Sequence, residues 1–113
     1  MSVNQGTTTA GQPLRSTLAN DPDMRELIQL YIQDLPTRLD GIRIAMSTGN
    51  LNEVRRLSHQ LRGASAGFGF APIGLVAAEV EETIKAIHEQ ADAMDRVRPL
   101  VEKLDALARR VAA

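Results

Sequence analysis

Apolar residues recur every three or four positions along most of the chain, which is the period of helices that bury one face. In the first such stretch, from Pro22 to about Thr48, the apolar positions are Met24, Ile28, Tyr31, Leu35, Leu39, Ile42 and Met46. We expect Asp21 to cap this helix, with Pro22 at its first position. Pro36 removes an interior hydrogen bond and should bend the helix, and the Gly49-Asn50 pair should end it.

Three further stretches with the same period follow after short connections. The second helix should stop in the Gly67–Gly69 segment, the third should begin at Pro72, and the fourth should be capped by Asp92. Their apolar stripes are Val54, Leu57, Leu61, Ala64 and Phe68 in the second; Ile73, Val76, Ala77, Val80, Ile84 and Ile87 in the third; and Met94, Val97, Val101, Leu104, Ala108 and Val111 in the fourth. Pro99 falls inside the last stripe, so this helix is either kinked near Arg96 or begins only at Pro99.

Four amphipathic helices on short connections bury their stripes most simply as an antiparallel up-down four-helix bundle, so the expected fold class is all-α. The 15 alanines and 13 leucines, against only three aromatic residues, also favour helices over sheet. Residues 1–13 are polar or helix-breaking and are expected to form a flexible tail. Residues 14–113 are expected to form the bundle domain, to which Leu14 to Ala19 should add a short N-terminal helix.

Charge and residue usage exclude several classes of function. The 13 basic and 14 acidic residues leave a net charge of −1, which gives no attraction for nucleic acid or an anionic membrane. The chain has no cysteine, which excludes thiol nucleophiles and cysteine metal sites. It also lacks an apolar run of about 18 residues and a signal-peptide pattern, so we expect a cytoplasmic protein. We expect a monomer, because stripes that cover one another leave no further apolar face.

Motifs for metal, nucleotide or serine chemistry do not fit the pattern. The two histidines, His59 and His88, lack the Glu-x-x-His spacing of a bundle metal site, because Arg56 and Lys85 stand three residues before them. The segment Gly63–Gly67 has the letters of a Gly-x-Ser-x-Gly nucleophile elbow, but it continues a helix, whereas an elbow joins a strand to a helix. No glycine-rich phosphate loop occurs. We therefore expect no metal, no cofactor and no free-standing enzyme activity.

His59 differs from His88 in its surroundings on a helical wheel. It projects about 180° from the centre of the apolar stripe and should face water. The residues within about 60° of it are Arg55, Arg56, Arg62, Gly63 and Ala66. Imidazole is a nucleophile at neutral pH, guanidinium groups offset phosphoryl charge, and missing side chains leave room for another protein. This face suits a phosphoryl acceptor, a role that would explain the roughly 1 kcal/mol that Gly63 costs in mid-helix.

The segment His59-Gln-Leu61-Arg62-Gly63, followed by Gly69 ten residues after the histidine, resembles the signature of histidine-containing phosphotransfer (HPt) domains. In that signature a lysine is commoner at the place of Arg62, and the exchange keeps the charge. The motif is fairly specific, and the likeness extends over about residues 14–111.

Weaker similarities to the same family lie on either side of this motif. Residues 21–27 and the Leu35-Pro36 pair resemble its first long helix. Glu79-Val80-Glu81 resembles its later Leu-Glu element, with Val80 in place of the usual leucine.

The resemblance implies that His59 takes a phosphoryl group from the aspartyl phosphate of one response-regulator receiver domain and passes it to the aspartate of another. The resemblance also implies that the chain has no kinase activity of its own and that the receiver supplies Mg²⁺ and most of the catalytic groups. A hybrid histidine kinase is a further partner that the resemblance implies. Arg62 and Gly63 would support the phosphoryl site; the receiver would dock on Arg55, Arg56 and Ala66. The alternative is a helical interaction module without phosphoacceptor chemistry, since interfaces also favour arginine and small residues.

Overall fold

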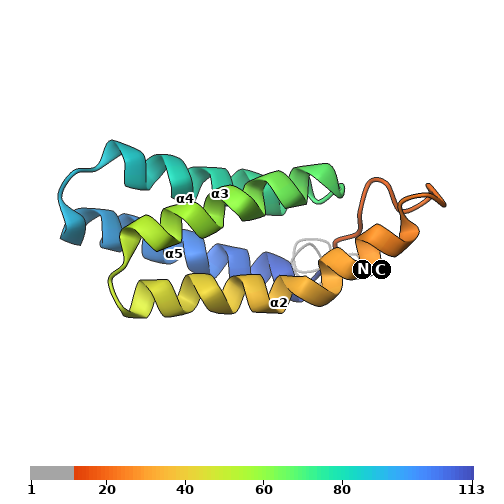
Figure 1. Cartoon of the computed structure of the whole chain (residues 1–113), viewed down its shortest axis with the longest axis horizontal. Helices are drawn as coiled ribbons and strands as arrows, with labels where there is room; N and C mark the ends of the chain where they lie inside the picture. The colour runs from red at the N-terminus through yellow and green to blue at the C-terminus, as the bar shows by residue number, and fades with distance from the viewer. Residues whose placement is uncertain (1–11) are drawn as a thin grey trace, which may run out of the picture.

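The structure, a computed structural model, describes residues 12–113. Its helices are α2 (Arg25–Ser47), α3 (Leu51–Gly67), α4 (Ala71–Ala86) and α5 (Gln90–Arg109). Figure 1 shows them side by side, with the chain turning back at each short connection. α3 packs against α2 and α4, and α5 packs against α4 and α2, so the helices enclose one core. The described residues contain an isolated bridge but no strand, and the prediction of an all-helical bundle of four helices is confirmed.

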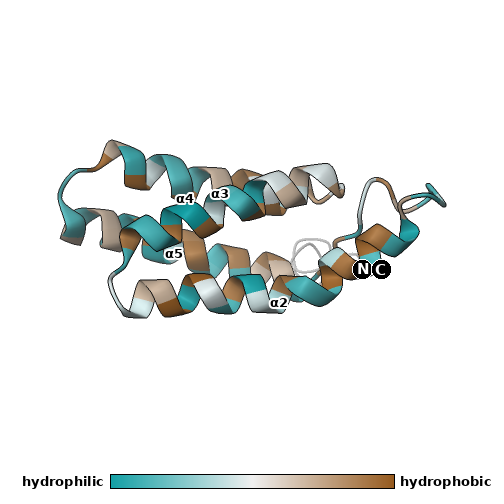
Figure 2. Cartoon of the chain, viewed as in Figure 1, coloured by the Kyte–Doolittle hydropathy of each residue, from teal (hydrophilic) through white to brown (hydrophobic). Residues whose placement is uncertain are grey.

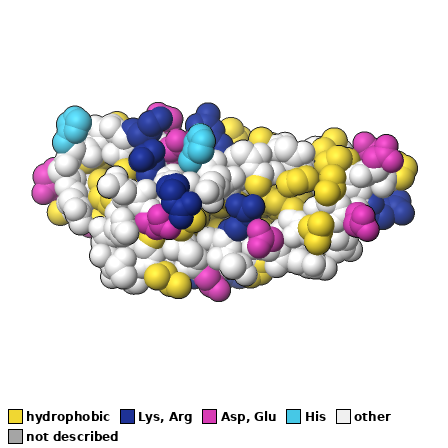
Figure 3. Space-filling view, viewed as in Figure 1, with side chains coloured by type: hydrophobic (Ala, Val, Ile, Leu, Met, Phe, Trp, Pro, Cys, Tyr) yellow, Lys and Arg dark blue, Asp and Glu magenta, His cyan; other side chains and the backbone are white. Residues whose placement is uncertain are grey.

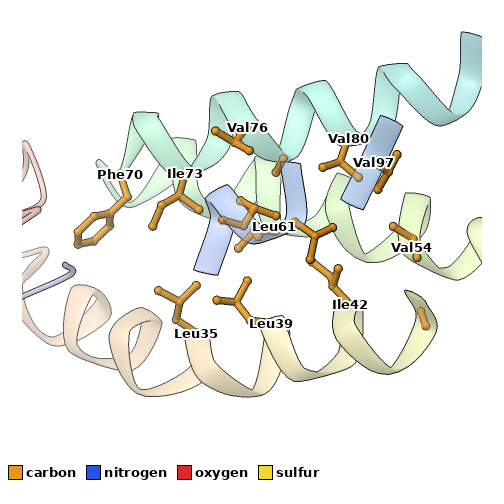
Figure 4. Packing of buried hydrophobic residues seen from close by; sticks show 14 of the residues in the cluster. Leu35, Leu39, Ile42, Val54, Leu61, Phe70, Ile73, Val76, Val80 and Val97 are labelled. Carbon is orange, nitrogen blue, oxygen red and sulfur yellow. The ribbon is translucent and has the colours of Figure 1, made fainter. Parts of the chain in front are cut away.

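The core forms where the apolar faces of the four helices meet. In Figure 2 apolar and polar segments alternate along each helix, as expected of amphipathic helices. Figure 4 shows Leu35 and Leu39 of α2 pointing toward Ile73 of α4, with Leu61 of α3 between the helices. Leu61 and Ile73 are completely buried, and each such side chain stabilises the fold by about 1.5–3 kcal/mol.

Two predicted helix starts are wrong. α2 begins at Arg25, because Asp21 anchors a turn in which its Oδ1 accepts from Asp23 N at 2.9 Å. α5 begins at Gln90, where the Glu89 carboxylate caps the helix by accepting from Asp92 N at 2.9 Å. In both places the carboxylate of a residue outside the apolar stripe accepts a hydrogen bond from a backbone N–H group. The apolar periodicity does not show which residue will do so, so it does not predict where the helix begins.

Both interior prolines lie within continuous helices. In Figure 1 the N-terminal part of α2 (orange) is inclined to the rest (yellow), as expected where Pro36 lacks a helical N–H. Pro99 lies inside α5, which already runs from Gln90. The alternative in which this helix begins at Pro99 is therefore wrong.

The expected short N-terminal helix is also wrong. Leu14 pairs with Val111 in an isolated parallel bridge, and residues 17–20 form turns. Leu14 and Leu18 nevertheless pack against the core. Of the expected flexible tail, residues 1–11 lie outside the described residues.

The N-terminal segment is fastened to the connection between α3 and α4. Ser16 Oγ donates to Phe68 O at 2.6 Å, and Thr17 N donates to Gly69 O at 3.0 Å. Gly69 has a φ of +84°, and a Cβ there would collide with Ser16 Oγ. Glycine is therefore required at residue 69 by the backbone and by its neighbour.

Large apolar side chains remain on the surface of the described part of the chain. They are Leu27, Leu30, Ile44 and Leu75, with exposed fractions of 44%, 56%, 64% and 67%. The expectation that no apolar face is left over is therefore wrong. Within residues 12–113, no helix combines the length and the apolarity needed to cross a membrane.

Candidate functional site

α3, which carries the candidate residues, is buried along a face that includes two serines. Its buried positions are Val54, Ser58, Leu61 and Ser65, whereas Leu57 and Ala64 of the predicted stripe are only half-buried. The helix is turned this way because α4 approaches closely on the serine side. A Cβ on Gly74 of α4 would lie 3.4 Å from Arg62 O and 3.5 Å from Ser65 Cβ.

Ser65, the central residue of the rejected nucleophile elbow, is part of this packing. It is completely buried, and its Oγ lies 2.7 Å from the hydroxyl of Tyr31. The Tyr31 ring in turn stacks on Phe70, with ring centroids 4.9 Å apart. Ser65 is therefore a structural residue that links α3 to α2.

His59 projects from α3 into solvent, as predicted. Its side chain is 67% exposed, and its Nδ1 lies 2.9 Å from Oε2 of Glu81 on α4. Because an ionised carboxylate can only accept, Nδ1 carries the proton, and in the neutral ring Nε2 then carries the lone pair. Nε2 has no hydrogen-bond partner among residues 12–113. The nitrogen that is free to react is therefore Nε2, on the side of the ring away from Glu81.

Glu81 is nearly buried, with 5% of its side chain exposed. Burial by itself raises the pKa of this carboxyl, but hydrogen bonds from Arg62 and His59 and the charge of Lys85 together hold the pKa below its ordinary value. Arg62 Nη1 donates to Oε1 at 3.1 Å, and Lys85 Nζ lies 3.8 Å from Oε2. Glu81 is therefore a fixed anion at neutral pH, placed against the Nδ1 side of the His59 ring.

Small residues line the exposed side of α3 next to His59. Gly63, Ala66 and Gly67 are all exposed, and a Cβ on Gly63 or Gly67 would meet nothing within 4 Å. Gly63 lies one turn beyond His59 on the same side of the helix. The predicted open approach to the histidine is thus present in the structure.

The three predicted arginines do not act as one group. Arg62 shares the Glu81 carboxylate with His59 and is joined to the site. Arg56 is bound instead to Glu53, with Nε donating to Oε1 at 2.9 Å. Arg55 is half-buried and has no ion pair within residues 12–113. Only Arg62 is therefore placed beside the histidine.

Two charged residues of the site, Glu81 and Lys85, were not predicted to be there. Both lie on α4, and the apolar stripe of one helix does not reveal which polar residues of a neighbouring helix stand opposite it. The available signal was the Glu79-Val80-Glu81 element, which the family resemblance includes.

An apolar groove opens beside α2. It has a volume of about 450 Å³ and is lined by Leu27, Leu30, Tyr31, Gln33, Asp34, Arg38 and Phe68. In Figure 3 apolar side chains gather over the N-terminal half of α2, on the face that also shows a histidine over α3. At about 1.5 Å per residue, Phe68 lies roughly 13 Å along the helix from His59. The groove and the histidine are thus within the reach of a single small domain.

The protein-family model described as Hpt domain matches residues 26–113 of this chain. No curated protein and no solved structure matches it. The matched region contains all four helices except the first residue of α2, and hence the whole cluster of His59, Arg62, Glu81 and Lys85.

Proposed function

The chain belongs to the Hpt domain family, whose members are phosphocarriers in two-component signalling, and from this premise we propose that His59 is its phosphoacceptor. The chain is then a phosphorelay intermediate. His59 accepts a phosphoryl group from the aspartyl phosphate of one receiver domain and passes it to the aspartate of another. The observation that carries this proposal is an exposed imidazole whose Nδ1 is bonded at 2.9 Å to a buried carboxylate.

The transfer step follows from the hydrogen bond to Glu81. The lone pair of His59 Nε2 attacks phosphorus and forms the N–P bond, while the P–O bond to the receiver aspartate breaks and its electron pair returns to the carboxylate. Nδ1 keeps its proton, so the ring gains a positive charge that the Glu81 anion stabilises. The reverse sequence passes the group on, and each direction needs mainly alignment and charge neutralisation.

Arg62 and Gly63 support the phosphoryl site in this proposal. The Arg62 guanidinium, held 3.1 Å from Glu81, has further N–H donors with which it can offset the charge of the phosphoryl oxygens. Gly63 presents no side chain, so the active site of a receiver can approach the ring.

The receiver domain docks on the exposed side of α3 and on the groove beside it. Arg55, Arg56 and Ala66 belong to the first surface, and Leu30 and Phe68 to the second. An exposed apolar patch next to a reactive side chain supports a protein partner, because such patches mark interaction sites. The net charge of −1 also favours a protein over nucleic acid or a membrane.

The chain itself has no kinase activity in this proposal. The receiver supplies Mg²⁺ and most of the catalytic groups, and a hybrid histidine kinase is the source of the phosphoryl group. The chain acts as a cytoplasmic monomer, and its apolar groove is covered only when a receiver docks.

Mixing the purified chain with a panel of receiver domains that carry radiolabelled phosphate tests the proposal. We expect label to move to the chain, to be lost in acid and to survive alkali, as a phosphoramidate requires. His59→Gln should abolish labelling and keep the fold, whereas His88→Gln should label normally. A plain interaction module would bind a receiver without taking label, and acid-labile label on the His59→Gln chain would contradict the proposal.

A further inference from the structure

Two charged residues of α4, Glu82 and Lys85, extend the cluster around His59. Lys85 Nζ lies 3.7 Å from Glu82 Oε2 and 3.8 Å from Glu81 Oε2. Arg62 Nη1, which donates to Glu81, lies 3.8 Å from Glu82 Oε2. Two cations are thus shared between a buried carboxylate and an exposed one.

The two carboxylates hold these cations differently. Glu81 is 5% exposed and accepts hydrogen bonds at 2.9 and 3.1 Å. Glu82 is 63% exposed, and its contacts of 3.7 and 3.8 Å are too long for hydrogen bonds. Glu82 therefore attracts Arg62 and Lys85 by charge alone, and another anion can compete with it.

Lys85 is close enough to His59 to respond to such an anion. His59 Nδ1 lies 2.9 Å and Lys85 Nζ 3.8 Å from the same oxygen, Glu81 Oε2, so the two nitrogens are at most 6.7 Å apart. A phosphoryl group on Nε2, on the far side of the ring, lies a few ångströms farther from Nζ, at a separation comparable with the screening length of about 8 Å at physiological ionic strength. The Lys85 side chain is also 51% exposed, so the ammonium is free to move toward a new charge.

A phosphoryl group on His59 would change the charge balance of this cluster. Without it, Arg62 and Lys85 neutralise Glu81 and Glu82. The phosphoryl oxygens carry a charge of about −1.5 to −2, which the positive charge gained by the ring offsets only in part. These oxygens attract the same two cations and are repelled by Glu82. We propose that Lys85 and Glu82 set how much phosphoryl group His59 retains at equilibrium with a receiver: Lys85 favours the phosphorylated form, and Glu82 opposes it.

This inference rests on the proposed function of His59 and adds a regulating element to it. A relay protein must release its phosphoryl group as readily as it accepts it. An exposed carboxylate that competes for the neutralising cations keeps the phosphorylated form from becoming too stable. The effect of each charge should match that of an exposed ion pair, about two- to fivefold in the equilibrium constant.

The test is the equilibrium ratio of phosphorylated chain to phosphorylated receiver, measured at low and at high salt. Lys85→Gln should lower the ratio about two- to fivefold, Glu82→Gln should raise it by a similar factor, and the double variant should lie near the unaltered chain. Both shifts should shrink at high salt. Lys103→Gln and Glu102→Gln are the matched controls, since they make the same charge changes at exposed sites on α5.

Opposite shifts that depend on salt cannot come from a loss of fold, which would lower the ratio in both variants. The inference is overturned if the unaltered chain takes label on His59 but Lys85→Gln and Glu82→Gln behave like their controls at low salt. A chain that takes no label, or takes it without His59, overturns the proposed function and this inference with it.

Discussion

Substitutions at Gly63 should affect the stability of the fold and the rate of phosphoryl transfer in opposite directions. Gly63 lies inside α3, and a Cβ there would meet nothing within 4 Å, so alanine fits without strain. Glycine in a helix interior is less favourable than alanine by about 0.8–1.0 kcal/mol. Gly63→Ala should therefore raise the free energy of unfolding by about 1 kcal/mol, which corresponds to a rise in Tm of roughly 4–8 °C for a domain of this size.

A longer side chain at the same position should also obstruct the receiver. Gly63 lies one turn from His59 on its exposed side, so the side chain in Gly63→Gln would stand where a receiver must approach Nε2. Misplacing reacting groups by about 1 Å costs up to a hundredfold in rate, and we expect transfer to fall at least tenfold. Gly63→Ala is the matched control, because its methyl group has open space around it and is too short to obstruct the receiver.

Thermal melting followed by circular dichroism and the rate of label transfer from one receiver are measured on the same samples. The expected result is a chain that is more stable than the original and a poorer phosphocarrier. If Gly63→Gln transferred at the original rate, the receiver would not approach across this part of α3. A lower Tm for Gly63→Ala would mean that the bundle itself requires glycine there, contrary to the geometry.

Three further predictions concern the supporting structure. Gly69→Ala should lower the free energy of unfolding, measured by urea titration, by about 1–3 kcal/mol, because the new Cβ would sit on a backbone with positive φ and collide with Ser16 Oγ. Unchanged stability would show that the N-terminal segment is not held against Gly69 in this way. Tyr31→Phe should lower the free energy of unfolding by about 1–2 kcal/mol, since it deprives the buried Ser65 hydroxyl of its partner; a neutral result would show that Ser65 finds another hydrogen-bond partner. The pKa of Glu81 is lowered from its ordinary value of 4.5, so its ionised form stabilises the fold above that pH, and the contribution is lost as pH falls through the lowered pKa. The stability difference between the unaltered chain and Glu81→Gln should therefore change between neutral and acid pH, and a difference independent of pH would contradict this role.

The helices could be predicted from the sequence because each one buries a continuous apolar stripe. Ile73 and Val80, for example, occupy the predicted face of α4 and are completely buried. The ends of the helices were less predictable. Glu89 caps α5 although glutamate is not among the preferred capping residues, and Asp21 forms a turn in place of a cap.

The candidate site could be predicted only as far as it lies on one helix. The exposure of His59 and the open space at Gly63 follow from the periodicity of α3 alone. The position of Glu81 depends on how closely α4 approaches, which is set by the small residues Ser65 and Gly74. Such packing between helices leaves no signal in the pattern of a single helix, so the partner of the histidine became visible only in the structure.

In the relay that we propose, His59 carries the phosphoryl group on Nε2 because Glu81 holds Nδ1, which lies 2.9 Å from its carboxylate. The most direct test is NMR of the histidine ring nitrogens, with ¹⁵N label, before and after phosphorylation by a receiver. We expect a protonated Nδ1 in the free chain and phosphorylation of His59 at Nε2, with His88 unchanged. Phosphorylation at Nδ1 of His59, at His88 or at a serine would contradict it.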